Sequence, residues 1–201
     1  MGRPKRQARE EILGAAREGF RRNGIRRITM EELARELRTS KTTIYREFPS
    51  KEVLVAEVMS QLNREIDAKL EAIIASGEPF PMKLQRVTDF TAALLSGTDE
   101  RFLSDLAAET PEIWEEYQRQ RRRRVEVLYR ALFEQGRRLG YIRDDIPLGI
   151  LVEIYLKLTH LTVDSTALEE ADATSREMYL AVGELFFHGA QGYAKIRRRT
   201  V

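Results

Sequence analysis

The chain has 201 residues, enough to bury a substantial core in one or two domains, and it contains no cysteine. A disulfide framework and a thiolate metal site are therefore impossible. Only two histidines are available as metal ligands, no apolar run reaches the roughly 20 residues of a membrane span, and the N-terminus lacks the apolar centre of a secretory signal. We expect a cytoplasmic protein with no metal, no other cofactor and no membrane contact.

Basic residues are concentrated near the N-terminus, although the net charge is only +2. Residues 1–50 hold 13 Lys and Arg against 7 Asp and Glu, a balance of +6. Residues 51–201 hold 21 against 25, a balance of −4. This asymmetry indicates an anionic partner for the N-terminal part alone.

Abundant Ala, Leu, Glu and Arg, with no sustained alternation of apolar and polar residues, predict an all-α protein of about nine helices. The first helix is expected over residues 7–23, with Gly24 as its left-handed cap. The second begins at Thr29, and Glu32 is spaced to complete a capping box with it.

A third short helix is expected after Ser40, with Ile44 and Phe48 on its buried side. Pro49 interrupts it, and Ser50 caps a fourth helix that extends to about residue 70. Five more helices are predicted over about 82–95, 99–108, 111–139, 147–162 and 174–194.

Two short helices joined by a tight turn are typical of a helix-turn-helix, here residues 29–48. The exposed side chains of the second helix are hydroxylic or basic, and such groups bind phosphate oxygens and base edges in the major groove. The alternative is an ordinary surface helix whose polar face is solvated. The candidate DNA-binding residues are Thr29, Arg38, Ser40, Lys41, Thr42, Thr43, Tyr45, Arg46 and Lys51.

The same region carries a specific series of residues: Gly2, Arg3, Pro4, Ile12, Leu13, Ala15, Ala16, Phe20, Gly24, Thr29, Glu32, Leu33, Ala34, Ser40, Lys41, Thr43, Ile44, Tyr45, Phe48, Lys51, Glu52 and Leu54. With this series the chain resembles the TetR family of bacterial transcriptional regulators. The resemblance implies a homodimer that binds a double-stranded operator through residues 1–52. It also implies an all-helical domain over residues 53–201 for dimerisation and for an unknown small-molecule effector.

Three positions depart from the family pattern. Arg38 stands where the family usually has glycine in the turn, so we expect strain or a different shape there. Thr42 replaces a small residue at the start of the recognition helix, and Glu47 puts a carboxylate where many members have His or Tyr against phosphate. The basic arm of residues 2–6 either enters a minor groove or is a solvated terminus.

The segment 147–162 is apolar nearly all round, and the last helix also has an apolar face. Two copies of this helix pair, meeting on a two-fold axis, would cover both faces. The alternative is that these helices are simply the domain core. The candidate dimer residues are Leu151, Ile154, Leu158, Met178, Ala181, Leu185 and Gly189.

Aromatic side chains of the C-terminal half are candidates for a hydrophobic effector pocket, although aromatic residues at helical spacing are also typical of a core. His160 shares a helix face with Asp164, but two ligands do not define a metal site, and a polar pair or a pocket hydrogen bond is the alternative. The candidate pocket residues are Phe90, Phe102, Trp114, Tyr117, Phe133, Tyr155 and His160.

The basic run 119–124 wraps the whole circumference of a helix, so we interpret it as a solvated segment rather than a binding face. The sequence has no glycine-rich phosphate loop, no paired metal ligands and no nucleophile elbow, which argues against an enzyme. A ligand-released repressor is favoured, because a dimer on its operator blocks polymerase without further contacts. The alternative is a helical adaptor or ligand-binding protein without DNA binding.

Overall fold

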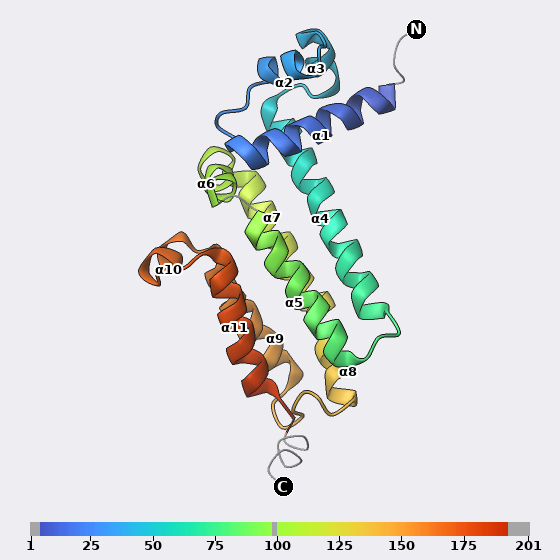
Figure 1. Ribbon diagram of the computed structural model, residues 1–201, viewed down its shortest axis with the longest axis vertical. Coiled ribbons are helices and arrows are strands. Elements are labelled where there is room, and N and C mark those ends of the chain that lie inside the picture. The colour runs from blue at the N-terminus through green and yellow to red at the C-terminus, as the bar shows by residue number, and fades with distance from the viewer. Residues whose placement is uncertain (1–4, 98–99, 193–201) are drawn as a thin grey trace. The chain divides into compact units, whose positions relative to one another are not determined.

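The computed structural model describes residues 5–97 and 100–192. Within these ranges the regular structure is helical, and the single β pairing is an isolated bridge between Ile142 and Gln191. The predicted all-α class is therefore confirmed. Figure 1 follows the helices along the chain, from the blue N-terminal to the red C-terminal part.

The N-terminal helices lie close to their predicted positions. Helix α4 continues five residues past the expected end at residue 70, because Ile73 and Ile74 extend its buried side. The bounds are α1 Lys5–Asn23, α2 Met30–Glu36, α3 Lys41–Glu47 and α4 Lys51–Ala75.

The later helices differ from the prediction in two places. The long helix expected over 111–139 contains a π-helical turn between α7 and α8. A six-residue helix, α10, was not predicted; Asp164 caps it by accepting hydrogen bonds from the backbone amides of Thr166 and Ala167. The bounds are α5 Phe80–Gly97, α6 Glu100–Glu109, α7 Pro111–Arg124, η1 Val125–Tyr129, α8 Arg130–Arg138, α9 Leu148–His160, η2 Leu161–Val163, α10 Ser165–Glu170 and α11 Ser175–Ala190.

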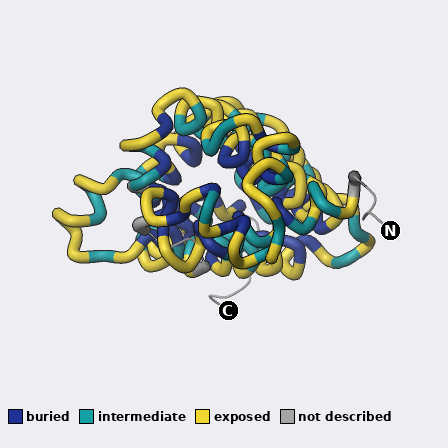
Figure 2. The backbone as a smooth tube through the Cα atoms, turned by 90° about the horizontal axis from the view of Figure 1, so that it is seen from above, coloured by how far each residue is buried: buried dark blue, intermediate teal, exposed yellow. Residues whose placement is uncertain are grey.

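The chain forms two compact units. The first comprises residues 1–65 and 97–118, and its core includes the fully buried side chains of Phe20, Ile44 and Phe48. Along the whole tube of Figure 2, buried stretches in dark blue are interrupted by exposed positions in yellow. From the sequence, we expect DNA binding by residues 1–52, and dimerisation and effector binding by residues 53–201. This division by function stays a prediction.

The second unit comprises residues 66–96 and 119–201, and its core is aromatic. The Tyr155 ring lies 4.9 Å from that of Tyr129, 5.4 Å from that of Phe133 and 5.0 Å from that of Phe186, measured between centroids. Gly136 is required here, because a Cβ at this position would lie 2.5 Å from the ring of Phe80. The packing therefore depends on ring contacts between η1, α8, α9 and α11.

Candidate nucleic-acid interface

Helices α2 and α3 have seven residues each, too few to be stable in isolation, so caps and packing must hold them. The Thr29 hydroxyl accepts from the Glu32 amide at 3.1 Å, and the Glu32 carboxylate accepts from the Thr29 amide at 2.8 Å. This is the capping box that the sequence predicts, and its hydrogen bonds lower the pKa of Glu32. At the second helix, the Ser40 hydroxyl accepts from the Thr43 amide at 3.1 Å.

The turn between the two helices is closed by backbone hydrogen bonds around Arg38. The Thr39 amide donates to the Ala34 carbonyl at 2.9 Å, and the Arg38 amide donates to that of Arg35 at 3.2 Å. Arg38 lies in the left-handed region with a φ of 50°, where glycine is ordinarily preferred. The turn therefore keeps the tight shape that a glycine would give, and Arg38 adopts a strained backbone.

Helix α3 has one buried side and one exposed side. Ile44 is completely buried, and so is Phe48, the C-cap residue of α3. The opposite side exposes Lys41, Thr42, Tyr45 and Arg46. Since the buried side fixes the orientation of the helix, the polar side chains project away from the core, as a recognition helix requires.

The cations of this surface have partners within the protein. Lys41 Nζ lies 3.0 Å from a carboxylate oxygen of Glu31, and Arg46 Nε lies 3.2 Å from one of Glu47. The hydrogen bond from Lys41 lowers the pKa of Glu31. Exposed pairs contribute only about 0–1 kcal/mol, so a phosphate group can replace the carboxylate at low cost.

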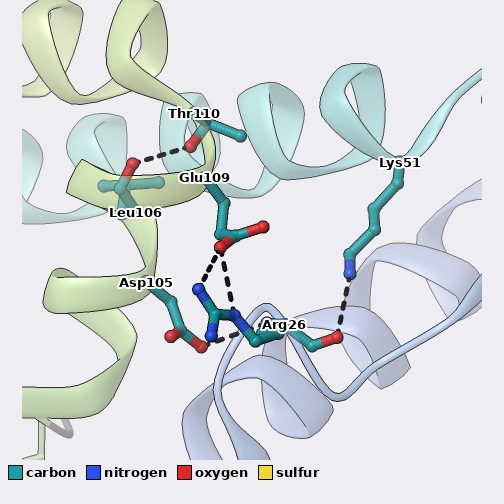
Figure 3. A network of polar contacts seen from close by, with 6 residues as sticks. All are labelled: Arg26, Lys51, Asp105, Leu106, Glu109 and Thr110. Carbon is teal, nitrogen blue, oxygen red and sulfur yellow. Dashed lines mark hydrogen bonds and ion pairs between the residues drawn. The ribbon is translucent and has the colours of Figure 1, made fainter.

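A polar network holds the loop that precedes α2 against α6 (Figure 3). The Arg26 amide donates to Asp105 at 3.0 Å, and the Arg26 guanidinium contacts Glu109 at 2.5 Å. Lys51 Nζ donates to the Arg26 carbonyl at 3.5 Å. The amide and the carbonyl of Arg26 are thereby both held, so the loop is fixed shortly before α2 begins.

The structure places the candidate DNA-binding residues together on α2, the turn, α3 and the start of α4. The hydroxyl groups of Thr29 and Ser40 also form the helix caps, a role that the capping pattern predicts, and the Thr43 hydroxyl lies 2.9 Å from that of Ser40. Their contact with DNA stays a prediction. The expected arm of residues 2–6 lies partly outside the described residues.

The candidate pocket residues are divided between the two units, and their role as a pocket stays a prediction. Phe102, Trp114 and Tyr117 belong to the first unit, where the Trp114 and Tyr117 rings stack at 5.5 Å. Phe90, Phe133, Tyr155 and His160 belong to the second unit, in which Phe133 and Tyr155 are core residues and His160 is exposed. Phe133 and Tyr155 therefore match the alternative interpretation, in which the aromatic residues form the core.

Four tyrosine and threonine hydroxyls meet within the second unit, and three of them were absent from the predicted pocket set. Thr91 and Tyr129 hydroxyl oxygens lie 3.2 Å apart, and those of Tyr155 and Tyr179 lie 3.5 Å apart. Burial raises the pKa of both Tyr155 and Tyr179 well above the ordinary value, so these phenols stay neutral. Sequence spacing alone did not reveal this group, because its members come from four different helical segments.

The candidate dimer residues divide by exposure. Ile154 and Leu185 are exposed by 44% and 76%, and Ala181 and Gly189 are exposed as well. Leu158 and Met178 are half-buried, whereas Leu151 is buried within the unit. Leu151 is therefore a core residue in this structure. Ile150, which the sequence analysis did not select, is 50% exposed.

The basic run 119–124 is only partly solvated. Arg122 and Arg123 are exposed as expected, and Arg122 pairs with Glu126 at 2.9 Å. Arg124, in contrast, has a side chain only 9% exposed, and it contacts Asp67 at 2.5 Å. Arg121 donates to the Thr159 carbonyl. The solvated interpretation is therefore wrong for Arg121 and Arg124, because two positions of the run turn toward neighbouring helices.

Three further findings concern metal binding, Asp164 and membrane spans. No group of three or more His, Asp or Glu side chains in the described residues lies close enough together to hold a metal ion. Asp164, considered beside His160 as a polar partner, accepts hydrogen bonds from the first turn of α10 instead. Along the same described ranges, none of the helices is long and apolar enough to cross a membrane.

The fold and the capped helix pair define an all-helical helix-turn-helix protein. A sequence model described as bacterial regulatory proteins, tetR family, matches residues 12–58. The N-terminal segment therefore matches the tetR family over these residues, which confirms the resemblance seen in the sequence. No curated protein matches the chain.

Solved structures share the fold over nearly the whole chain. A transcriptional regulator from Saccharomonospora viridis, in complex with choline, has a TM-score of 0.73 and 19% identity, covering 92% of this chain and 98% of that one. A tetR-family regulator from Agrobacterium tumefaciens has a TM-score of 0.69 and 18% identity, and the match covers 94% of this chain and 100% of that one. The structure of the SmeT–triclosan complex has a TM-score of 0.69 and 18% identity, and the match covers 93% of each chain. The chain therefore has the fold of tetR-family DNA-binding transcriptional regulators.

Proposed function

We propose that this protein is a homodimeric repressor that binds a pseudo-palindromic operator and is released by a small, largely hydrophobic ligand. The observation that carries the proposal is the exposed polar side of α3, held in place by the closed turn at Arg38. Lys41, Thr42, Tyr45 and Arg46 supply cations, a hydroxyl and a phenol for phosphates and base edges. Regulation, rather than catalysis, is consistent with the family match.

The exposed apolar side chains of α9 and α11 support the dimer. Ile150, Ile154 and Leu185 lie at least 44% exposed, and such side chains favour burial against another surface. Two-fold pairing of identical surfaces covers them and gives an assembly with two copies of α3. In an operator complex these copies would occupy successive major grooves, about 34 Å apart.

Release by a ligand is supported by the relatives and by the aromatic second unit. The Saccharomonospora viridis regulator is described in complex with choline, and SmeT in complex with triclosan. A ligand that binds one spacing of the dimer better than another shifts the population by its differential affinity. A hydrophobic ligand suits a core of phenylalanine and neutral tyrosine side chains.

The proposal is tested by electrophoretic mobility shift with the DNA upstream of the protein's own gene. We expect a discrete complex that survives competition by non-specific duplex and weakens steeply as salt rises. Loss of the shift in the Thr42→Asp variant, with wild-type thermal unfolding, would support binding through α3. A folded wild-type protein that binds no duplex even at low salt would instead favour the adaptor alternative.

A further inference from the structure

Arg9, on α1, connects the end of the recognition helix to two other helices. One guanidinium nitrogen of Arg9 donates to the Glu47 carbonyl at 2.9 Å, and another donates to a Glu57 carboxylate oxygen at 3.2 Å. Glu47 is the last residue of α3, and Glu57 lies on α4. A single side chain therefore bridges α1, α3 and α4.

The same guanidinium also lies over an aromatic ring. Its central carbon is 4.3 Å from the centroid of the Phe48 ring, a distance typical of a cation–π contact. Phe48 is the C-cap of α3 and is completely buried. Arg9 thus contacts the terminal carbonyl and the capping side chain of α3 at once, through a planar group that cannot pivot freely between them.

These contacts act on the C-terminal end of α3. The N-terminus of α3 has the Ser40 cap, whereas no side chain of α3 itself accepts or donates to close its last turn in the described contacts. A cation at a helix C-terminus complements the partial negative charge of the exposed carbonyls. Arg9 supplies that cation from another helix.

We infer that Arg9 is a specificity-determining positioning residue: it fixes the C-terminal end of α3, and thereby the approach of the exposed α3 side chains to base edges. Base readout by hydrogen bonds depends on sub-ångström placement of the helix, whereas attraction to phosphates depends chiefly on charge. Loss of Arg9 should therefore reduce discrimination between sequences more than it reduces general affinity for DNA. This inference rests on the proposed DNA-binding function.

The chain offers a matched control eight residues further along α1. Arg17 forms an ion pair with Glu65 of α4 at 2.7 Å, so it repeats the Arg9–Glu57 pair with the same 48-residue separation. Both arginines are partly exposed, at 38% and 44% of their side chains. The Arg17 pair joins α1 to α4 without contacting α3. Arg17→Gln therefore controls for the lost charge and the lost α1–α4 contact.

The experiment compares Arg9→Gln with Arg17→Gln on two probes. One is a duplex selected by the wild-type protein from a random-sequence library, and the other is a scrambled duplex of equal length. We expect Arg9→Gln to bind the selected duplex at least about tenfold more weakly than Arg17→Gln does. The two variants should bind the scrambled duplex equally and show equal dependence on salt.

Two outcomes would overturn the inference. Equal affinity of both variants for the selected duplex would show that Arg9 does not position α3. Equal weakening of Arg9→Gln on both probes, with a salt slope lower by about one, would make Arg9 a direct phosphate contact. Failure of the wild-type protein to select any sequence would contradict the proposed function itself, independently of Arg9.

A conservative variant and a partner variant keep the test decisive if Arg9→Gln folds poorly. Arg9→Lys retains the charge but cannot reach Glu47 and Glu57 together, so its specific affinity should fall while its affinity for the scrambled duplex stays at the wild-type value. Glu57→Gln removes one anchor of Arg9 and should cause a smaller loss in the same direction. Wild-type discrimination in both variants would refute the positioning role.

Discussion

Arg38 adopts the left-handed backbone conformation that the turn between α2 and α3 requires, with a φ of 50°. The sequence predicted strain at this residue, because the family pattern has glycine there, and the structure shows where the strain lies. A residue with a Cβ is less stable in this region by about 1–2 kcal/mol than in the right-handed region. The turn is nonetheless kept closed by the Thr39 and Arg38 amides.

We predict that Arg38→Gly is more stable than Arg38→Ala by about 1 kcal/mol, because only glycine relieves the left-handed strain. Because neither variant has the arginine side chain, its contribution to stability does not affect the comparison. Chemical denaturation measures the difference in free energy of unfolding. Equal midpoints for the two variants would show that the turn adopts another conformation in solution.

The Glu31 carboxylate competes with phosphate for Lys41, which it contacts at 3.0 Å. We predict that Glu31→Gln binds every duplex more tightly, by about two- to fivefold, because an exposed ion pair contributes at most about 1 kcal/mol. Fluorescence anisotropy with specific and scrambled duplexes measures the effect. Glu36→Gln is the control, since Glu36 also lies on α2 but its nearest cation is Arg22, at 3.9 Å.

A gain confined to the specific duplex would contradict this reasoning for Glu31, because release of a cation from an internal carboxylate does not depend on the base sequence. An equal gain in Glu36→Gln would show that general acidity of α2, rather than the contact with Lys41, controls the affinity.

At the scale of helices, the elements most accurately predicted were those whose ends have chemical signals. The capping box predicted from Thr29 is formed, and the helix expected from residue 111 begins at Pro111. The helix expected from residue 174 begins at Ser175, where Thr174 and Glu177 form a second capping box. Helix α10 escaped prediction because six residues give no periodic pattern. The π-helical turn before α8, in which Val125 and Tyr129 are buried, also has no local sequence signal.

The capping box of α11 gives a prediction about pH. Its hydrogen bonds to Thr174 lower the pKa of Glu177 from the ordinary value of 4.5. A carboxyl whose pKa is lower in the folded state stabilises the protein above its unfolded pKa, and that contribution is lost as the pH falls through the folded value. Acid should therefore weaken this cap.

We predict that Thr174→Ala lowers the free energy of unfolding by about 1 kcal/mol near neutral pH, which is typical for loss of an N-cap hydroxyl. The difference from wild type should shrink as the pH falls below about 4.5, because Thr174→Ala removes the hydroxyl that donates to the Glu177 carboxylate at 2.7 Å, and protonated Glu177 accepts that bond only weakly in the wild type. Thermal unfolding between pH 3 and 7 measures this difference in the free energy of unfolding, with Thr166→Ala as the control. A difference that is constant with pH would show that the Glu177 carboxylate adds nothing to the cap.

At the scale of the molecule, sequence reasoning was strongest for surfaces and weakest for interiors. The exposed side of α3 followed from periodicity, which says which positions share a helix face. The core contacts of Phe133 and Tyr155 were not predicted, because they depend on which helices pack together. Periodicity does not determine those partners, and it cannot distinguish an outward apolar residue from a buried neighbour such as Leu151.

The predicted dimer can be tested at Leu185, whose side chain is 76% exposed. We predict that Leu185→Glu folds with wild-type stability within about 0.5 kcal/mol, because no internal packing is lost, but that it sediments as a monomer. A monomer reads one half-site, so its affinity for the full operator should fall by about a hundredfold or more. Met82→Glu, on α5 and 53% exposed, adds the same charge and should remain a dimer with wild-type affinity. Since two carboxylates buried without partners cannot be tolerated at a two-fold contact, a Leu185→Glu protein that is still dimeric would require an interface formed by other helices.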